Sequence, residues 1–121
     1  MKDNLLVLLS KQFAIDIINL CLKLKDKNIL INQLLRSGTS IGANIHEGNY
    51  AASRADFINK FQIALKECYE TDYWLDNFKE TKIISIDEYN DLIAKCSKIR
   101  TIIIASITTA KRKNAEPSVK Q

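Results

Sequence analysis

The stretch NLLVLLSKQFAIDIINLCLKLK, residues 4–25, decides the fold class because its apolar residues recur at steps of three and four. This stripe consists of Leu6, Leu9, Phe13, Ile17, Leu20 and Leu24. The spacing predicts an amphipathic helix over these residues. Further apolar residues widen its face, which predicts contact with more than one neighbour. They are Leu5, Leu8, Ile15, Ile18 and Leu22.

Three further segments carry helical patterns. Residues 29–50 keep apolar side chains at helical spacing, although their middle is rich in poor helix formers. The third segment opens at Ser53, whose hydroxyl can cap the backbone amide of Asp56. The fourth opens at Ser85, which forms a capping box with Glu88 and marks the clearest boundary in the chain.

Glycine and proline are too scarce for a multi-stranded sheet, with three and one in 121 residues. Residues 101–104 are dense in β-branched side chains, but the helical pattern on both sides predicts that they are helical too. Four long helices with short polar turns predict an all-α, antiparallel up-down-up-down four-helix bundle. We expect one domain over residues 1–113, followed by a flexible C-terminal tail over 114–121.

Composition indicates a folded cytoplasmic protein, with 46% hydrophobic and 26% charged residues. The longest uninterrupted apolar run, residues 5–9, is too short to span a bilayer, so no membrane partner is expected. Cys21, Cys68 and Cys96 are far apart without a CxxC pair, which favours buried free thiols. The net charge of +4 favours acidic partners such as nucleic acid, although solubility alone also explains it.

Catalysis and metal binding find little support. His46 is the only histidine, which excludes paired-histidine metal sites and the Glu-x-x-His motifs of di-iron bundles. We therefore expect no enzyme activity, no metal and no cofactor. Glu47 is expected to be partly buried and paired with Arg36 or Arg54, as a structural and not a catalytic group.

Gly38 and Gly42 stand four residues apart and share one helix face. Each glycine lowers helix propensity by roughly 1 kcal/mol relative to alanine, so tight packing against another backbone is the natural compensation. A phosphate-binding loop is the alternative, but the segment lacks the GK[ST] ending of a P-loop and follows no predicted strand.

Basic residues are the candidates for a nucleic-acid surface, and the sequence leaves open whether they share a face. They are Arg36, Arg54, Lys60, Lys66, Lys111, Arg112 and Lys113. The last three also suit the C-terminal end of a helix dipole, which is the plainer explanation. Tyr69, Tyr73 and Trp74 lie among acidic residues, so the stretch 67–76 indicates a protein-facing or packing surface.

The glycine-containing segment also carries a resemblance to a known family. The motif and packing positions are Ser37, Gly38, Thr39, Ser40, Ile41, Gly42, Ala43, Asn44, Glu47 and Gly48. This run resembles the signature of the bacterial four-helix-bundle family named after ribosomal RNA intervening-sequence proteins. Residues 53, 56–57, 63–67 and 73–75 resemble the family's third helix, so the likeness covers nearly the whole chain.

The resemblance implies a small all-α subunit that assembles into a ring-like homopentamer and has no known catalytic residues. It also implies a similarity to the accessory variability protein of diversity-generating retroelements, which is associated with a reverse transcriptase and nucleic acid through a basic surface. His46 departs from the family pattern, which often has a small residue there, so close helix packing at this point is in doubt.

The leading hypothesis is a non-enzymatic oligomeric scaffold that binds RNA or DNA electrostatically. The alternative is a protein-interaction adaptor for a nucleic-acid enzyme such as a reverse transcriptase, without direct nucleic-acid binding. An enzyme dependent on His46 ranks third, since no substrate is indicated.

Overall fold

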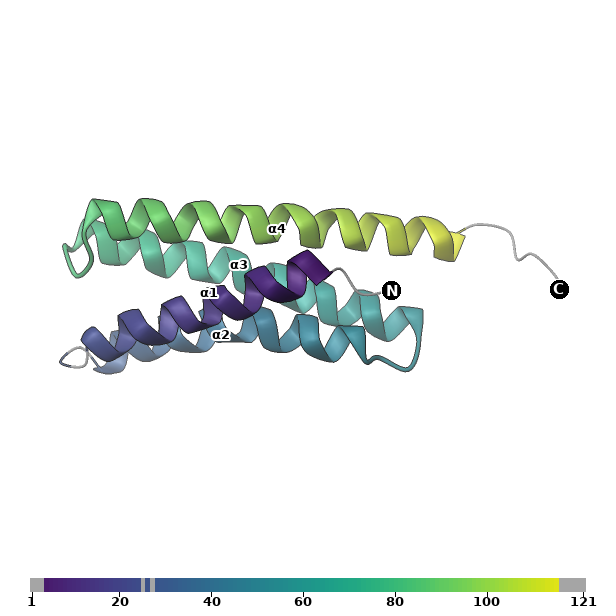
Figure 1. Cartoon of the computed structure of the whole chain (residues 1–121), viewed down its shortest axis with the longest axis horizontal. Helices are drawn as coiled ribbons and strands as arrows, with labels where there is room; N and C mark the ends of the chain where they lie inside the picture. The colour runs from purple at the N-terminus through teal and green to yellow at the C-terminus, as the bar shows by residue number, and fades with distance from the viewer. Residues whose placement is uncertain (1–3, 25, 27, 116–121) are drawn as a thin grey trace, which may run out of the picture.

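The computed structural model describes residues 4–24, 26 and 28–115, and they form a four-helix arrangement. The helices are α1 (Asn4–Lys23), α2 (Asn28–Asn49), α3 (Arg54–Glu80) and α4 (Ile86–Ala115). Successive helices run in opposite directions along one long axis (Figure 1). The predicted all-α four-helix bundle is confirmed.

Side-chain caps fix the starts of α3 and α4. The Ser53 hydroxyl accepts a hydrogen bond from the backbone N–H of Asp56 at 3.1 Å. The Ser85 hydroxyl accepts from the N–H of Glu88 at 3.0 Å, and the Glu88 carboxylate accepts from the N–H of Ser85 at 2.9 Å. These bonds satisfy amides that a helix leaves without partners at its first turn. Both predicted caps are confirmed.

Tertiary packing overrides the strand preference of residues 101–104, which are helical as predicted. Ile103 is fully buried, whereas Thr101 and Ile104 on either side of it are exposed. Burial of the isoleucine outweighs the few tenths of a kcal/mol that a β-branched residue loses in a helix. Helix α4 continues to Ala115, beyond the predicted domain end at residue 113. Residues 116–121 of the predicted tail lie outside the described residues.

The largest buried side chains of the core are three phenylalanines, Phe13, Phe61 and Phe78. The three cysteines are buried and free, as predicted. Burial raises the pKa of the Cys21 thiol to about 11. A hydrogen bond with the Cys68 thiol, together with burial, raises the pKa of Cys96 above its ordinary value. Thiols held in the protonated form are poor nucleophiles, so Cys21 and Cys96 act as packing groups.

Helices α1 and α2 approach each other closely at the two glycines. A Cβ atom on Gly42 would lie 3.2 Å from the backbone oxygen of Ser10. A Cβ atom on Gly38 would lie 3.0 Å from the side chain of Ile17. A larger residue at Gly42 therefore has no room unless α1 moves away. The partner of the glycine face is α1 of the same chain.

The seam between α1 and α4 is the least closed part of the bundle. Of the four neighbouring helix pairs, α2 and α3 make the most extensive contact and α1 and α4 the least. Helix α1 has 20 residues and α4 has 30, a difference of about 15 Å at about 1.5 Å per residue. The C-terminal part of α4 extends past the start of α1 (Figure 1).

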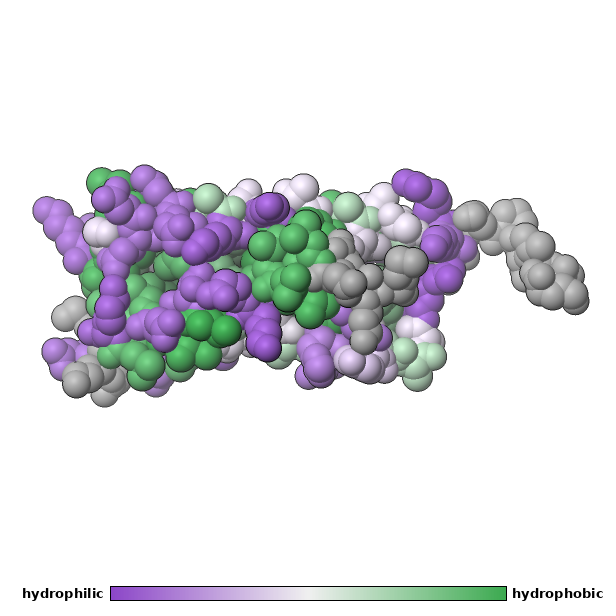
Figure 2. All heavy atoms as spheres, viewed as in Figure 1, coloured by the Kyte–Doolittle hydropathy of each residue, from purple (hydrophilic) through white to green (hydrophobic). Residues whose placement is uncertain are grey.

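The outer side of α1 is apolar and exposed. Leu8 and Leu22 are 65% and 68% exposed, and Leu5, Ile15 and Ile18 are also exposed. Apolar side chains gather over α1 in the space-filling view (Figure 2). The sequence predicts that these five residues meet a further neighbour, and none of the other helices in the described part of the chain covers them.

By length and composition alone, the stretch Leu5–Lys23 is apolar enough to cross a membrane, with a mean hydropathy of 1.8 and 33% of it buried. Core helices meet the same criteria, and α1 contributes Leu6, Phe13 and Ile17 to the core. The expectation that the protein has no membrane partner stays a prediction.

Replacing Gly42 by leucine should lower the free energy of unfolding by about 1–3 kcal/mol, because the side chain must displace α1. Ala43→Leu is the matched control: Ala43 is the next residue along α2 and is exposed, so its change should stay within about 0.5 kcal/mol. Chemical denaturation followed by circular dichroism measures both. Equal stabilities of the two variants would contradict the close contact.

Candidate nucleic-acid interface

Four cations gather at one end of the bundle. Arg54 begins α3, and Lys111, Arg112 and Lys113 lie in the last turns of α4. These two helix ends lie at the same end of the molecule (Figure 1). All four side chains belong to exposed residues, and none forms an ion pair with another described residue. We call these four residues the basic end.

Two other candidate cations are neutralised by carboxylates. Arg36 of α2 pairs with Glu67 at 3.3 Å and also with Glu70, both on α3. The hydrogen bond with Glu70 raises the pKa of Arg36, and the same bond lowers the pKa of Glu70. Lys60 pairs with Glu47 at 2.8 Å. These two cations tie α2 to α3 and are less available to an external phosphate.

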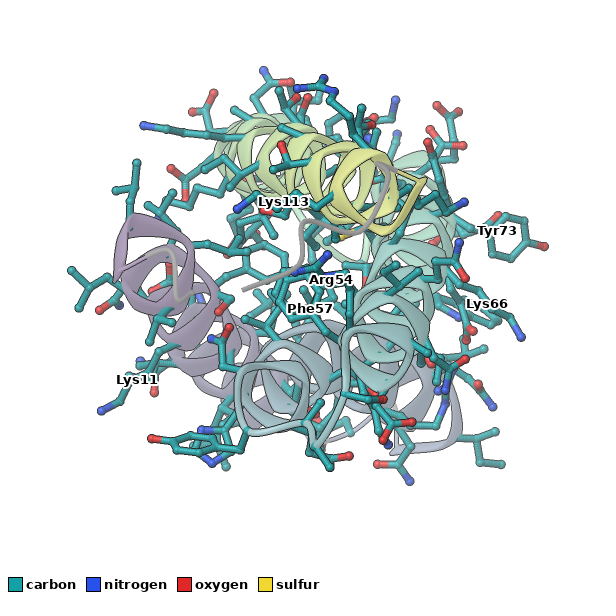
Figure 3. The ribbon with its side chains drawn as sticks, turned by 90° about the vertical axis from the view of Figure 1, so that its right-hand side faces the viewer. Lys11, Arg54, Phe57, Lys66, Tyr73 and Lys113 are labelled. Atoms are coloured by element: carbon teal, nitrogen blue, oxygen red, sulfur yellow. The ribbon has the colours of Figure 1, made fainter. Side chains whose placement is uncertain are left out.

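Lys66 stands apart from the basic end. It is exposed on α3 and points outward, as does Lys11 on α1, whereas Arg54 and Lys113 point toward the middle of the bundle end (Figure 3). The seven predicted nucleic-acid-binding residues therefore do not form one continuous face. Four of them form the basic end, two are paired, and Lys66 is separate.

Glu47 does not have the predicted surroundings. Its side chain is 56% exposed and pairs with Lys60, not with Arg36 or Arg54. The hydrogen bond from Lys60 lowers the pKa of the Glu47 carboxyl. The adjacent His46 is exposed, and its ring lies 5.1 Å from that of Tyr50 between centroids. Neither residue has the buried, positioned environment of a general acid or base.

The polar residues of the α2 motif form hydrogen bonds within α2 or with α3. Ser40 donates to the Arg36 carbonyl at 2.6 Å, and Asn44 donates to the Ser40 carbonyl at 2.8 Å. The buried Ser37 hydroxyl accepts from Thr71 of α3 at 3.0 Å. Such pairing allows polar groups to be buried between helices.

Other motif positions serve packing. Ile41 is fully buried, and Thr39 donates to the Leu35 carbonyl at 2.7 Å. A Cβ atom on Gly48 would come within 2.7 Å of the Phe61 ring. Ala43 is exposed. The motif therefore holds α2 between its two neighbours and presents no convergent set of catalytic groups.

Aromatic side chains form a separate surface on α3. Tyr69 and Tyr73 are 54% and 61% exposed, and Tyr73 points outward (Figure 3). Trp74 is half-buried and donates to Glu70 at 3.2 Å. The Arg100 guanidinium lies 5.3 Å from the centroid of the Tyr69 ring. The stretch 67–76 thus combines a packed tryptophan with two exposed tyrosines.

A groove of about 780 Å³ lies beside the basic end, between the start of α3 and the C-terminal half of α4. Phe57 and Phe61 line it, with ring centroids 4.1 Å apart in a stacked arrangement. Arg54 and Lys113 line it as well, and the view along the bundle shows both beside this opening (Figure 3). We call this the end groove.

Asn49 lines both the end groove and the smaller pocket between α1 and α2, and it carries a polar atom without a partner among the described residues. The side-chain oxygen Oδ1 of Asn49 is buried and accepts no hydrogen bond from the described residues. Sequence reasoning did not select Asn49 or the groove. The available signal was the greater length of the fourth helical pattern relative to the first, which leaves α4 without α1 beside its last turns.

Within the described residues, no group of three or more histidine, cysteine, aspartate or glutamate side chains is placed to hold a metal ion. The arrangement at the basic end is instead suited to binding anions through charge.

Comparisons with known proteins agree with this architecture. The chain is similar to a protein of unknown function of the S23 ribosomal protein family from Bacteroides thetaiotaomicron, whose crystal structure is known. The two share 44% sequence identity and a TM-score of 0.85, over 89% of this chain and 99% of that chain. No curated protein matches. The family model for the 23S rRNA-intervening sequence protein matches residues 2–105, and the chain therefore belongs to this family.

Proposed function

We propose that the protein is a non-enzymatic, homo-oligomeric scaffold that binds RNA or DNA through the phosphate backbone. The observation that carries this proposal is the basic end, where Arg54 and residues 111–113 place four cations at one end of the molecule, without an ion-pair partner among the described residues. Phosphate contacts of this kind give affinity and position without reading base sequence. The protein therefore recognises charge and strand geometry.

The distribution of ion pairs favours the end of the bundle, and not its sides, as the nucleic-acid-binding surface. On the sides, Arg36 and Lys60 already have carboxylate partners on the neighbouring helix. A phosphate there has to compete with a formed pair, whereas the basic end offers its charges directly. The family's name, 23S rRNA-intervening sequence protein, makes RNA the first ligand to test.

The exposed stripe of α1 supports self-association. A contiguous apolar surface of this kind usually marks an interface in a folded protein, and the family resemblance implies a homopentamer. Leu8 and Leu22, at two-thirds exposure each, are the residues that gain most from burial against a second copy. Assembly also brings several basic ends into one oligomer, so that many weak phosphate contacts together give a high avidity.

The aromatic surface of α3 favours a second candidate, a protein-interaction adaptor. Tyr69 and Tyr73 are exposed next to acidic side chains, and tyrosine is enriched at protein interfaces. In this case a partner protein, such as a nucleic-acid enzyme, carries the nucleic acid. Capture of that partner would then persist after nuclease treatment.

Binding of a labelled single-stranded RNA should weaken steeply with salt. With four phosphate contacts per protomer, the slope of log K against log salt should be about −3. Fluorescence anisotropy from low to physiological salt measures this slope. An absence of binding even at low salt would exclude the proposal and favour the adaptor.

Charge reversal locates the binding surface. The variant Lys111→Glu/Arg112→Glu/Lys113→Glu should bind RNA at least about tenfold more weakly. The control Lys11→Glu/Lys82→Glu/Lys98→Glu changes net charge equally at exposed positions away from the basic end and should bind much better than the first variant. Equal losses in both variants would indicate a response to net charge alone.

Self-association should depend on the α1 stripe. Leu8→Glu should convert the oligomer to the 13.8 kDa monomer, because a carboxylate is costly to bury in an apolar interface. Ile86→Glu is the matched control, since Ile86 is 66% exposed and Leu8 is 65% exposed. Light scattering after size-exclusion chromatography gives the masses. An unchanged mass of the Leu8 variant would remove α1 from the interface.

A further inference from the structure

The end groove combines features that the basic end alone does not explain. It is lined by two cations, Arg54 and Lys113, by an aromatic pair and by Asn49, whose buried Oδ1 has no partner among the described residues. We propose that the end groove binds the terminal nucleotide of a single strand, with its 5′-phosphate at the two cations and its base against Phe57. This inference rests on the proposed function and names the strand feature that this end recognises.

The cations favour a terminal phosphate over an internal one. A terminal phosphate monoester carries a charge of about −1.5 to −2 at neutral pH, whereas each internal phosphate carries one negative charge. The Arg54 guanidinium can donate two parallel hydrogen bonds to such a group. Arg54 is also the first residue of α3, where the helix dipole adds positive potential. Asp56, the acid of this first turn, does not line the groove.

The aromatic pair offers a platform for a base. Phe57 is half-buried and stacks on the buried Phe61, so its ring is held in place by the core. A base can stack on the remaining face of such a ring whatever its sequence identity. Ile102 of α4 adds apolar surface to the same groove. This arrangement fits a base better than it fits a bare inorganic anion.

Polar groups in the groove match the rest of a nucleotide. Asn49 lines the groove, and a side-chain amide can accept from a base amino group or a ribose hydroxyl. Ser106 and Thr109, which carry hydroxyls, line the α4 side of the groove. The volume of about 780 Å³ falls within the range of about 300–1,000 Å³ typical of small-molecule sites.

Small residues keep this space open. Ala51 and Ala52 precede α3, and Ala105 lines the groove from α4. Ala105 is exposed, so a larger side chain there can fill the groove without entering the core. Ala94 is also exposed on α4 but does not line the groove, which makes it a matched control position.

The test compares two ten-nucleotide RNAs, labelled at the 3′ end and carrying either a 5′-phosphate or a 5′-hydroxyl. At fixed salt, the 5′-phosphorylated strand should bind about tenfold more tightly. Ala105→Trp should remove this preference, so that the two strands bind this variant with equal affinity. Ala94→Trp should keep the preference. Fluorescence anisotropy provides the affinities.

The outcomes separate the two proposals. Equal, salt-sensitive binding of both strands would overturn the groove assignment and leave the proposed function intact. No binding of either strand would overturn the proposed function. A calorimetric titration with 5′-AMP distinguishes the source of the nucleotide: binding of AMP as tight as that of the phosphorylated strand, lost in Ala105→Trp, would make the groove a free-nucleotide site and overturn the strand-end assignment.

Discussion

The close contact between α1 and α2 is the constraint on which the rest of the structure depends. Gly42 lies so near the backbone of Ser10 that even a methyl group meets it at 3.2 Å. On the other side of α2, the Ser37 hydroxyl pairs with Thr71 of α3 inside the core. Helix α2 is therefore held between its two neighbours by small residues on one side and a buried polar pair on another. The unfavourable helix propensity of its glycines is offset by this packing.

This arrangement determines which surfaces remain free. Because the inner face of α1 packs against α2 and the core, its outer leucines stay exposed and available for contact with a second copy of the protein. Because α4 is longer than α1 and contacts it least, the last turns of α4 stand beside the start of α3 with a groove between them. Arg36 and Lys60 on the sides of the bundle form ion pairs, whereas Arg54 and residues 111–113 form none with the described residues. The groove and the cations of the basic end thus lie at the same end of the bundle.

The sequence predicted those features that depend on local spacing. The stripes, the Ser53 and Ser85 caps and the glycine face all follow from residues a few positions apart. The sequence alone could not predict the ion-pair partners of Arg36 and Glu47, because pairs between helices depend on how each helix is rotated about its axis. The end groove was also missed, since it depends on the relative lengths of α1 and α4 and not on any motif. Side chains distant in sequence, such as Asn49 and Lys113, converge only in the folded chain.

The central claim is that the end containing Arg54 and Lys113 is the nucleic-acid surface. Ultraviolet cross-linking of the purified protein to a 5′-phosphorylated RNA, followed by mass spectrometry of the peptides, tests it most directly. The account predicts cross-links within residues 48–61 and 102–113. Cross-links concentrated at Tyr69 and Tyr73, with none at these two segments, would contradict it.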